Sequence, residues 1–128
     1  MTDSIQNAVT VMHEMGIRRI IVQTGAGAGD SFAGMPLFMK GLIRFTGLKY
    51  VYADHDGQEK VLKDSNLDWT IVRPVGLINS TGDRLVRVSF NNIPRPGITI
   101  SRQHVARFMI ESIENDSFIR QTPVLSDE

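Results

Sequence analysis

The pattern of apolar residues along the chain alternates between helix-type and strand-type segments. Residues 3–15 carry apolar side chains at helical spacing, and Gly16 follows as a stop signal. Residues 17–24 then hold an unbroken run of β-branched residues, which is typical of a strand covered on both faces. A second run of this kind lies within residues 66–73 and ends at Pro74. Helices and strands in succession predict an α/β fold built on a parallel sheet.

Further helices flank these two strands. Residues 35–45 carry a methionine- and phenylalanine-rich stripe, which predicts a helix whose face is core or pocket wall, or alternatively a lid or dimer surface. Residues 48–64 predict a longer helix, and Ser101 caps a final one. The buried face of this final helix is expected to consist of Val105, Phe108, Met109, Ser112 and Ile113.

Two segments near the end of the chain predict peripheral strands. Residues 82–90 alternate, as expected of a one-sided strand, and residues 122–126 predict a short closing strand. The alternation places Val86, Val88 and Phe90 on one side of the first of these strands, and Arg87 and Ser89 on the other.

Composition narrows the function by exclusion. The 128 residues contain 14 basic and 14 acidic side chains, and this zero formal charge argues against nucleic acid as a partner. The absence of cysteine excludes thiol chemistry, disulfides and zinc–thiolate sites. The polar start and the lack of a membrane-length apolar run argue against a signal peptide and a membrane partner. We therefore expect one domain over residues 1–128, located in the cytoplasm.

The residues that follow the first strand are a candidate site, because ligands of parallel sheets collect beyond the carboxyl ends of the strands. Thr24 occupies this position, and the glycine-rich sequence GAGAGDS follows it. A dinucleotide fingerprint needs a third glycine where this loop has Asp30. The loop is therefore a weak phosphate cradle, and the alternative is a flexible loop over a cleft.

A second candidate group lies on the predicted helix 48–64. His55 and Glu59 are four positions apart and share a face of this helix. Three functions fit them: proton transfer by the imidazole, a histidine oriented by a carboxylate, or a metal site. The metal site is the least favoured of the three, because the sequence shows only one histidine here and no third ligand at a fixed spacing. The alternative is an ion cluster on the helix surface. His13 and His104 stand on predicted helices without partners, and we interpret both as structural.

The sequence Arg73-Pro74-Val75-Gly76 ends the second buried strand, at the same edge of the sheet as Thr24. Arg73 is either a site residue or a structural arginine that pairs with Asp54 or Asp56. The two strand ends and the His55 helix are expected to converge on one crevice. A hydrolase is not supported, because the chain lacks a Gly-x-Ser-x-Gly nucleophile motif.

Four segments together resemble the atypical short-chain dehydrogenase/reductases. These segments are RRIIVQTGAGAGDS, DHDGQEKVLKDSNLDWTIVRPVGL, TGDRLVRV and ITISRQHVARFMIESI. They are most similar to the NAD(P)-binding, NmrA-like group that includes the biliverdin reductase B-type flavin reductases. The resemblance implies a partial Rossmann-like parallel sheet with flanking helices, NAD(P) as cofactor, and reduction of a small molecule.

The resemblance also implies roles for single residues. The family's hydroxyl residues after the central strand fall on Gln23 and Thr24, near the nicotinamide and the substrate. The family's Tyr-x-x-x-Lys pair falls on His55 and Glu59, so a tyrosine relay is not expected. The implied catalytic residues are Thr24, His55 and Glu59. The implied cofactor-binding residues are Thr24, Gly25, Arg73, Pro74, Val75 and Gly76, and no metal is implied.

The chain departs from the family pattern on its N-terminal side. Family members begin with a strand and a G-x-x-G-x-x-G loop, whereas Met1 stands directly at the helix before the family's fifth strand. We therefore expect a truncated domain in which a lone chain holds NAD(P) weakly or not at all. Strand 17–24 would then lack a neighbour, and we predict a homo-oligomer that covers this open edge. Three functions stay open: a reductase, a non-catalytic oligomeric binding or assembly module, and an inactive remnant.

Overall fold

The computed structural model describes residues 2–26 and 48–128, which form an α/β fold, as predicted. In chain order the elements are α1 (Thr2–Met15), β1 (Arg19–Gln23), α3 (Leu48–Asp64), β2 (Asp68–Pro74), β3 (Gly76–Ile78), β4 (Val86–Ser89), β5 (Thr99–Ser101), α4 (Arg102–Glu114) and β6 (Val124–Asp127). Most of the predicted glycine-rich loop and the helix predicted over residues 35–45 lie outside the described residues.

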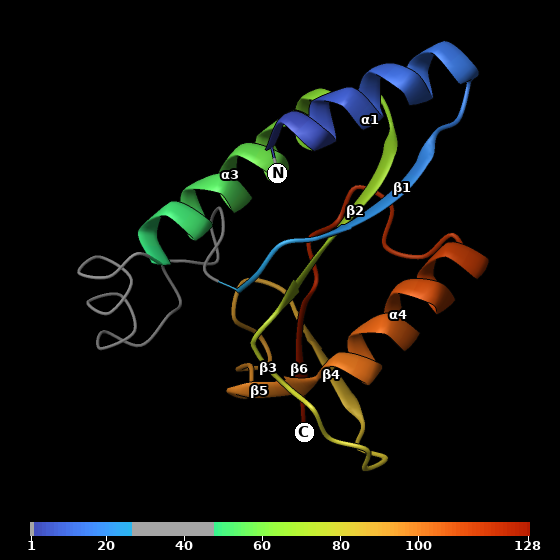
Figure 1. The fold of residues 1–128 in the computed structure, drawn as a ribbon. Coiled ribbons are helices and arrows are strands. Elements are labelled where there is room, and N and C mark those ends of the chain that lie inside the picture. The colour runs from blue at the N-terminus through green and yellow to red at the C-terminus, as the bar shows by residue number, and fades with distance from the viewer. Residues whose placement is uncertain (1, 27–47) are drawn as a thin grey trace.

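The main sheet has four strands in the order β1-β2-β6-β4 (Figure 1). Strand β2 pairs in parallel with both β1 and β6, whereas β4 runs antiparallel to β6 at the far edge. Strand β1 forms the other edge, and its second side has no partner strand among the described residues. Strands β3 and β5 form a separate parallel pair. The sheet is therefore predominantly parallel, as the two apolar runs predict.

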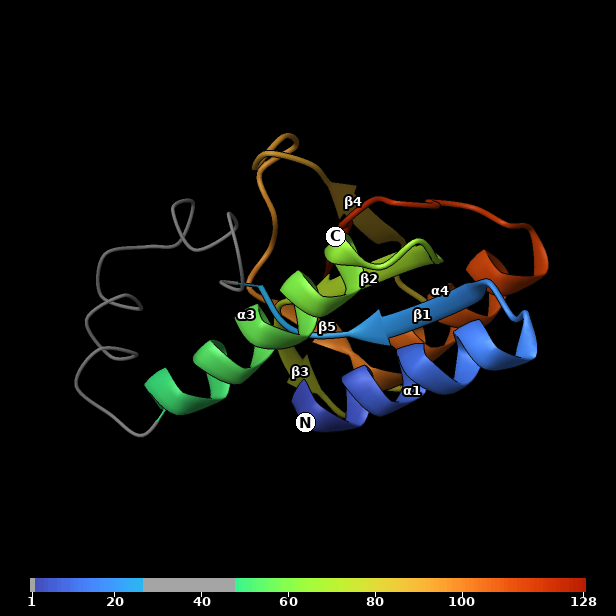
Figure 2. The same ribbon diagram turned by 90° about the horizontal axis from the view of Figure 1, so that it is seen from above.

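Helices cover both faces of this sheet. Helices α1 and α3 lie side by side on one face, and α4 lies on the other (Figures 1 and 2). Alternate residues of β1 point to opposite faces: Ile20 and Val22 pack against the cluster around Leu62, while Ile21 packs against the cluster around Val105. Coverage on both faces explains why the strand reads as an unbroken apolar run.

The register between β1 and β2 determines which residues meet at their carboxyl ends. The pairs run from Arg19 beside Asp68 to Gln23 beside Val72. Backbone hydrogen bonds continue past the strand, because the Thr24 N–H donates to the Val72 carbonyl at 2.9 Å. Thr24 is thereby fixed next to the end of β2, and the predicted convergence of the two strand ends is observed.

Arg19 secures the opposite end of the same two strands. Its guanidinium donates to the Asp68 carbonyl at 3.0 Å, to the Thr70 hydroxyl at 2.9 Å and to the Ser117 carbonyl at 2.8 Å. Burial lowers the pKa of Arg19, and the carboxylates of Asp116 and Asp68 act against this shift. The arginine ties β1 to β2 and to the segment after α4, at a distance from the carboxyl ends where the candidate site lies.

Several predicted details are wrong. Ser89, placed on the outer side of its strand, is fully buried, whereas Phe90 is 39% exposed, because β4 ends at Ser89 and the chain turns there. Ile113, placed on the buried face of the last helix, is 52% exposed. The three-residue strands β3 and β5 were not predicted. The predicted cap is confirmed, because the Ser101 hydroxyl accepts from the Gln103 N–H.

Candidate functional site

Three elements bring polar side chains together at the carboxyl end of the sheet. Thr24 follows β1, Arg73 stands near the end of β2, and Glu59 projects from α3. The Thr24 hydroxyl Oγ1 donates to Glu59 Oε2 at 2.8 Å. Arg73 Nη2 donates to Glu59 Oε1 at 2.6 Å, and its Nε donates to Glu59 Oε2 at 3.2 Å. The structure thus joins three predicted site residues in one hydrogen-bonded cluster, which we call the Thr24–Glu59–Arg73 cluster.

The cluster is withdrawn from solvent. Thr24 is 4% exposed, and Glu59 and Arg73 are each 2% exposed. Lys63 Nζ lies 3.8 Å from Glu59 Oε1, but its side chain is 41% exposed and contributes less than the buried guanidinium. A buried carboxylate is tolerated only when it is paired and hydrogen-bonded, and Arg73 supplies two parallel donors for that purpose. Glu59 therefore belongs to the protein interior rather than to an ion cluster on the helix surface.

His55 lies one helical turn before Glu59, at the margin of the cluster. A Cβ built on Gly25 would stand 3.7 Å from His55 Cδ2 and 3.8 Å from its Nε2, so the glycine and the imidazole lie side by side. His55 is half-buried, which leaves it closer to solvent than Glu59. On the same helix Gln58 is fully buried, and its Nε2 donates to Asp54 Oδ2 at 2.9 Å. The predicted shared face of His55 and Glu59 is thus turned toward the end of β1.

The residues after Arg73 shape the backbone beside the cluster. The Pro74 carbonyl accepts from the Ala26 N–H at 2.9 Å, which continues the contact between the two strand ends. The Val75 N–H donates to Leu125 in the next strand. A Cβ at Gly76 would stand 2.9 Å from the Ile98 carbonyl oxygen, so this approach between backbones requires glycine. Packing thus explains why residue 76 is a glycine. That these residues bind a cofactor stays a prediction.

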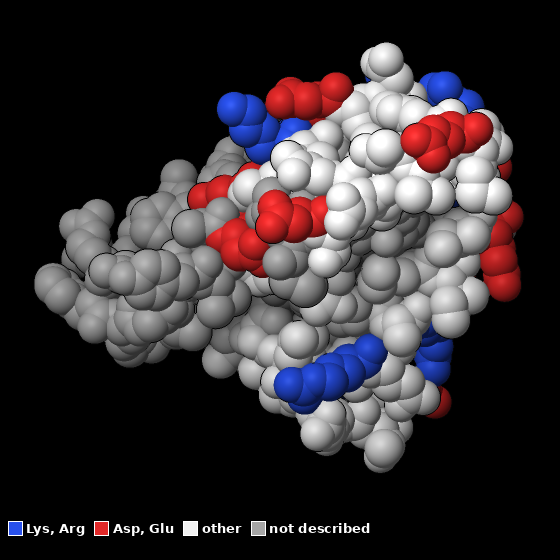
Figure 3. Space-filling model, turned by 45° about the horizontal axis from the view of Figure 1, so that its top comes forward, with Lys and Arg blue, Asp and Glu red and all other residues white. Residues whose placement is uncertain are grey.

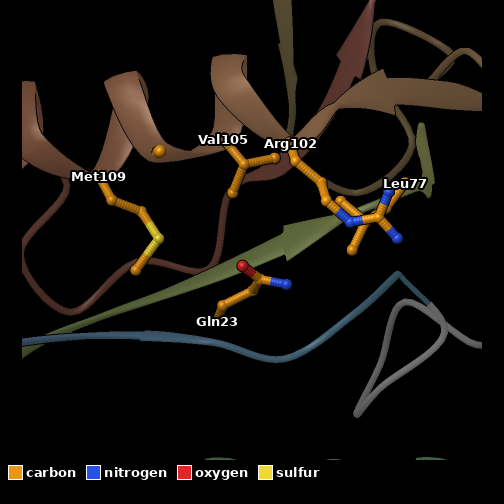
Figure 4. Close-up of a pocket in the computed structure, with 6 residues that line it drawn as sticks. Gln23, Leu77, Arg102, Val105 and Met109 are labelled. Carbon is orange, nitrogen blue, oxygen red and sulfur yellow. The ribbon is translucent and has the colours of Figure 1, made fainter. Parts of the chain in front are cut away.

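A cavity of about 310 Å³ opens beside the end of β1, on the α4 face of the sheet. Figure 4 shows Gln23, Leu77, Arg102, Val105 and Met109 around it. Its wall is apolar except for the Gln23 amide and the Arg102 guanidinium, whose Nη1 also donates to the Asn79 side chain at 3.0 Å. Arg102 and Leu77 were not among the predicted site residues. The sequence signals for the cavity were Gln23, which the resemblance places near the nicotinamide and the substrate, and the apolar stripe that contains Val105 and Met109.

A second buried polar cluster lies under the start of α4. His104 Nδ1 is 2.7 Å from Asp127 Oδ1, and its Nε2 is 2.9 Å from the Gly82 carbonyl oxygen. Asp127 Oδ2 also accepts from the Ser101 N–H at 3.1 Å. The interpretation of His104 as lacking partners is therefore wrong, although its contacts support the structural role. They fasten the capped end of α4 to β6.

The surface and the remaining side chains add three findings. On the face shown in Figure 3, acidic and basic side chains are interspersed with uncharged surface. Within residues 2–26 and 48–128, no group of three histidine or acidic side chains is arranged to hold a metal ion. No helix in this described part is long and apolar enough to cross a membrane.

The geometry offers a limited set of chemical functions at the end of β1. A hydroxyl with a fixed partner and a half-buried imidazole lie at Thr24 and Gly25, and the cavity on the α4 side is lined by the neighbouring Gln23. An imidazole can donate or accept a proton near neutral pH, which suits it for proton transfer to a bound molecule. The buried charge pair orients the hydroxyl and is itself too enclosed for direct contact with a large ligand.

Comparisons with known proteins give a consistent result. A family model described as NAD(P)H-binding matches residues 1–116. No curated protein matches the chain. ChuY from Escherichia coli CFT073 superposes with a TM-score of 0.81 at 22% identity, over 97% of this chain and 64% of that chain.

Two further solved structures are similar. The anaerobillin reductase ChuY from Escherichia coli O157:H7 gives a TM-score of 0.80 at 22% identity, over 96% of this chain and 56% of that one. A short-chain dehydrogenase/reductase from Veillonella parvula DSM 2008, solved in complex with NADP, gives 0.80 at 20% identity, over 98% and 58%. The chain spans less than two-thirds of the length of each neighbour. At these identities the likeness shows the fold.

Proposed function

Because the chain belongs to the NAD(P)H-binding family, we propose that it takes part in the NAD(P)H-dependent reduction of a small molecule at the carboxyl ends of β1 and β2. The observation that carries this proposal is the convergence of Thr24, His55 and the buried Glu59–Arg73 pair at one point of the sheet. Ligands of parallel sheets bind beyond the carboxyl ends of the strands. The NADP complex of a neighbour with the same fold supports the cofactor. We place this reaction in the cytoplasm.

The described residues suit the nicotinamide end of such a cofactor. Thr24 and His55 lie at the carboxyl end of β1. The backbone of Pro74, Val75 and Gly76 lies at the carboxyl end of the neighbouring strand β2. We assign these residues, with Gly25, to the nicotinamide and substrate side. The bound cofactor would supply a hydride, and the His55 imidazole would supply the accompanying proton. The buried Glu59 and Arg73 are assigned to orientation of Thr24.

Titration of the purified chain with NADPH and NADH, followed by nicotinamide fluorescence and calorimetry, tests this function. Saturable binding in the range of about 1 µM to 1 mM is expected if the strand ends hold the cofactor. Thr24→Val and His55→Ala should weaken binding or turnover with flavin and quinone acceptors. Lys60→Ala, at an exposed position of the same helix, is the matched control. No binding at millimolar NADPH and NADH would overturn the proposal.

A second function, an oligomeric binding or assembly module without catalysis, is favoured by the side of β1 that has no partner strand among residues 2–26 and 48–128. Ile20, Ile21 and Val22 stand on this edge without a proline, a lysine or a bulge to block pairing with another chain. Exposed apolar side chains also occur on both faces of the sheet. They are Val11, Met15 and Ile17 on the α1 side, and Ile110 and Ile113 on α4. Under this proposal a second copy covers residues 17–24.

Size-exclusion chromatography with light scattering tests the oligomer. Met15→Lys and Ile17→Lys change exposed side chains beside the edge and should convert the assembly into monomers. Leu85→Lys is the matched control, because Leu85 is 74% exposed but precedes β4 at the opposite edge of the sheet. A wild-type chain that is strictly monomeric at micromolar concentration would remove the homo-oligomer. Oligomers without cofactor binding would favour the assembly module over the reductase.

A further inference from the structure

The hydroxyl of Thr24 has its only hydrogen already engaged. A threonine hydroxyl offers one donor and two acceptor lone pairs. Its Oγ1 lies 2.8 Å from Glu59 Oε2, and an ionised carboxylate can only accept. The hydrogen must therefore point to Glu59, on α3. Oγ1 can therefore form a further hydrogen bond only as an acceptor, through its lone pairs.

Glu59 cannot easily turn away from this contact. Both of its oxygens are held by the guanidinium of Arg73, at 2.6 Å from Nη2 and 3.2 Å from Nε. Two parallel hydrogen bonds fix the plane of a carboxylate as well as its position. Because the side chains of both partners are 3% exposed or less, water is not available to replace either bond. The direction of the Thr24 hydrogen is consequently set by the buried pair.

We propose that Thr24 acts as an acceptor-only contact, which selects an N–H or O–H donor on the bound ligand and disfavours a carbonyl oxygen. Glu59 and Arg73 are positioning residues in this assignment, and act through Thr24 rather than on the ligand. A carbonyl placed against Oγ1 would leave two acceptors facing each other without a hydrogen between them. The donor that the nicotinamide ring carries is its carboxamide amino group, so the identity of the ligand rests on the proposed function.

The matched probes are NADPH and its 3-acetylpyridine analogue, in which a methyl group replaces the carboxamide amino group. The wild-type chain should bind NADPH about tenfold more tightly than the analogue, the ratio expected for one hydrogen bond. Thr24→Ser keeps the hydroxyl and should keep this ratio. Thr24→Val removes the acceptor and should lower the ratio toward one.

Glu59→Gln provides the sharper variant, because the glutamine amide can donate to Thr24. The hydroxyl hydrogen would then be released toward the ligand, and the analogue's carbonyl would gain a partner. The affinity ratio should fall by about tenfold in this variant while both ligands still bind. An unchanged ratio in both Thr24→Val and Glu59→Gln would overturn the assignment and leave the proposed cofactor binding intact.

A measurement on the free protein separates the two proposals. A buried hydroxyl proton donated to a carboxylate exchanges slowly with water, so NMR of the labelled wild-type chain should show a distinct Thr24 hydroxyl proton. This signal should persist in Thr24→Ser and shift or disappear in Glu59→Gln. A hydroxyl proton that exchanges as rapidly as that of an exposed threonine would overturn the acceptor-only assignment. A Thr24 hydroxyl proton that exchanges slowly with water, in a protein that binds neither NADPH nor NADH, would support the assignment and overturn the proposed function.

Discussion

Replacing Arg73 with methionine should cost far more stability than replacing both members of its ion pair. Arg73→Met leaves the Glu59 carboxylate, which is 2% exposed, with the Thr24 hydroxyl and the partly exposed Lys63 ammonium. Removal of one partner from a buried pair costs about 3–5 kcal/mol, because the remaining charge is left uncompensated. Lys63 lies 3.8 Å away and is 41% exposed, so it can relieve only part of this cost. We expect a loss of about 3 kcal/mol.

The double variant Glu59→Leu with Arg73→Met removes the buried charge altogether. Apolar side chains of similar size replace buried ion pairs with little loss of stability, so most of the deficit should be recovered. The Thr24 hydroxyl would lose its acceptor, which leaves a residual deficit of about 1 kcal/mol. The double variant should therefore be about 2 kcal/mol more stable than Arg73→Met alone.

Urea unfolding followed by circular dichroism measures these free energies, provided that the transition is two-state with unchanged slope. A loss of about 3 kcal/mol should also lower the melting temperature by roughly 10 °C for a chain of this size. An Arg73→Met variant within about 1 kcal/mol of the wild type would refute the reasoning. A double variant whose loss equals the sum of the two single losses would also refute it. Additive losses would mean that neither single change leaves an uncompensated buried charge.

Three other substitutions test contacts outside the Thr24–Glu59–Arg73 cluster by the same unfolding assay. His104→Ala should cost about 2–4 kcal/mol, because it strips the buried Asp127 carboxylate of a partner at 2.7 Å, and recovery of stability in His104→Ala with Asp127→Ala would confirm the cause. Gly76→Ala should cost about 1–3 kcal/mol, since its Cβ would approach a backbone oxygen to 2.9 Å; Gly25→Ala, with its nearest contact at 3.7 Å, should stay within about 0.5 kcal/mol. Ser101→Ala should cost about 1 kcal/mol through loss of the helix cap, and an equally large loss on Ser101→Thr would contradict this explanation.

The parts of the fold that the sequence predicts are those with a local signature. The runs in residues 17–24 and 66–73 are apolar because helices cover both faces of β1 and β2, and this coverage is visible in the sequence itself. The three-residue strands β3 and β5 were missed because their pairing joins Gly76 to Thr99, which no short window can reveal. Family membership is likewise confirmed at the level of an NAD(P)H-binding domain.

The candidate site shows the same division between local and distant information. Thr24, Glu59 and Arg73 were all placed at the site, but the arginine was expected to pair with Asp54 or Asp56 if it was structural. The pairing of Arg73 with Glu59 was not predicted, because it depends on the depth at which the two side chains are buried, and the sequence does not encode that depth locally. The partners of His104 were missed for a similar reason, because Asp127 lies 23 positions later.

The position of β6 in the sheet bears on how the chain can fold as it leaves the ribosome. Residues Val124–Asp127 are the last strand in the sequence, yet they lie between β2 and β4 and bury Leu125 completely. A nascent chain that has exposed everything before residue 124 therefore still lacks an inner strand and the strand with which β4 pairs. Folding of this sheet must wait until translation has passed that strand and the exit tunnel has released it. Shortening the chain before residue 124 would remove the middle of the sheet rather than trim its margin.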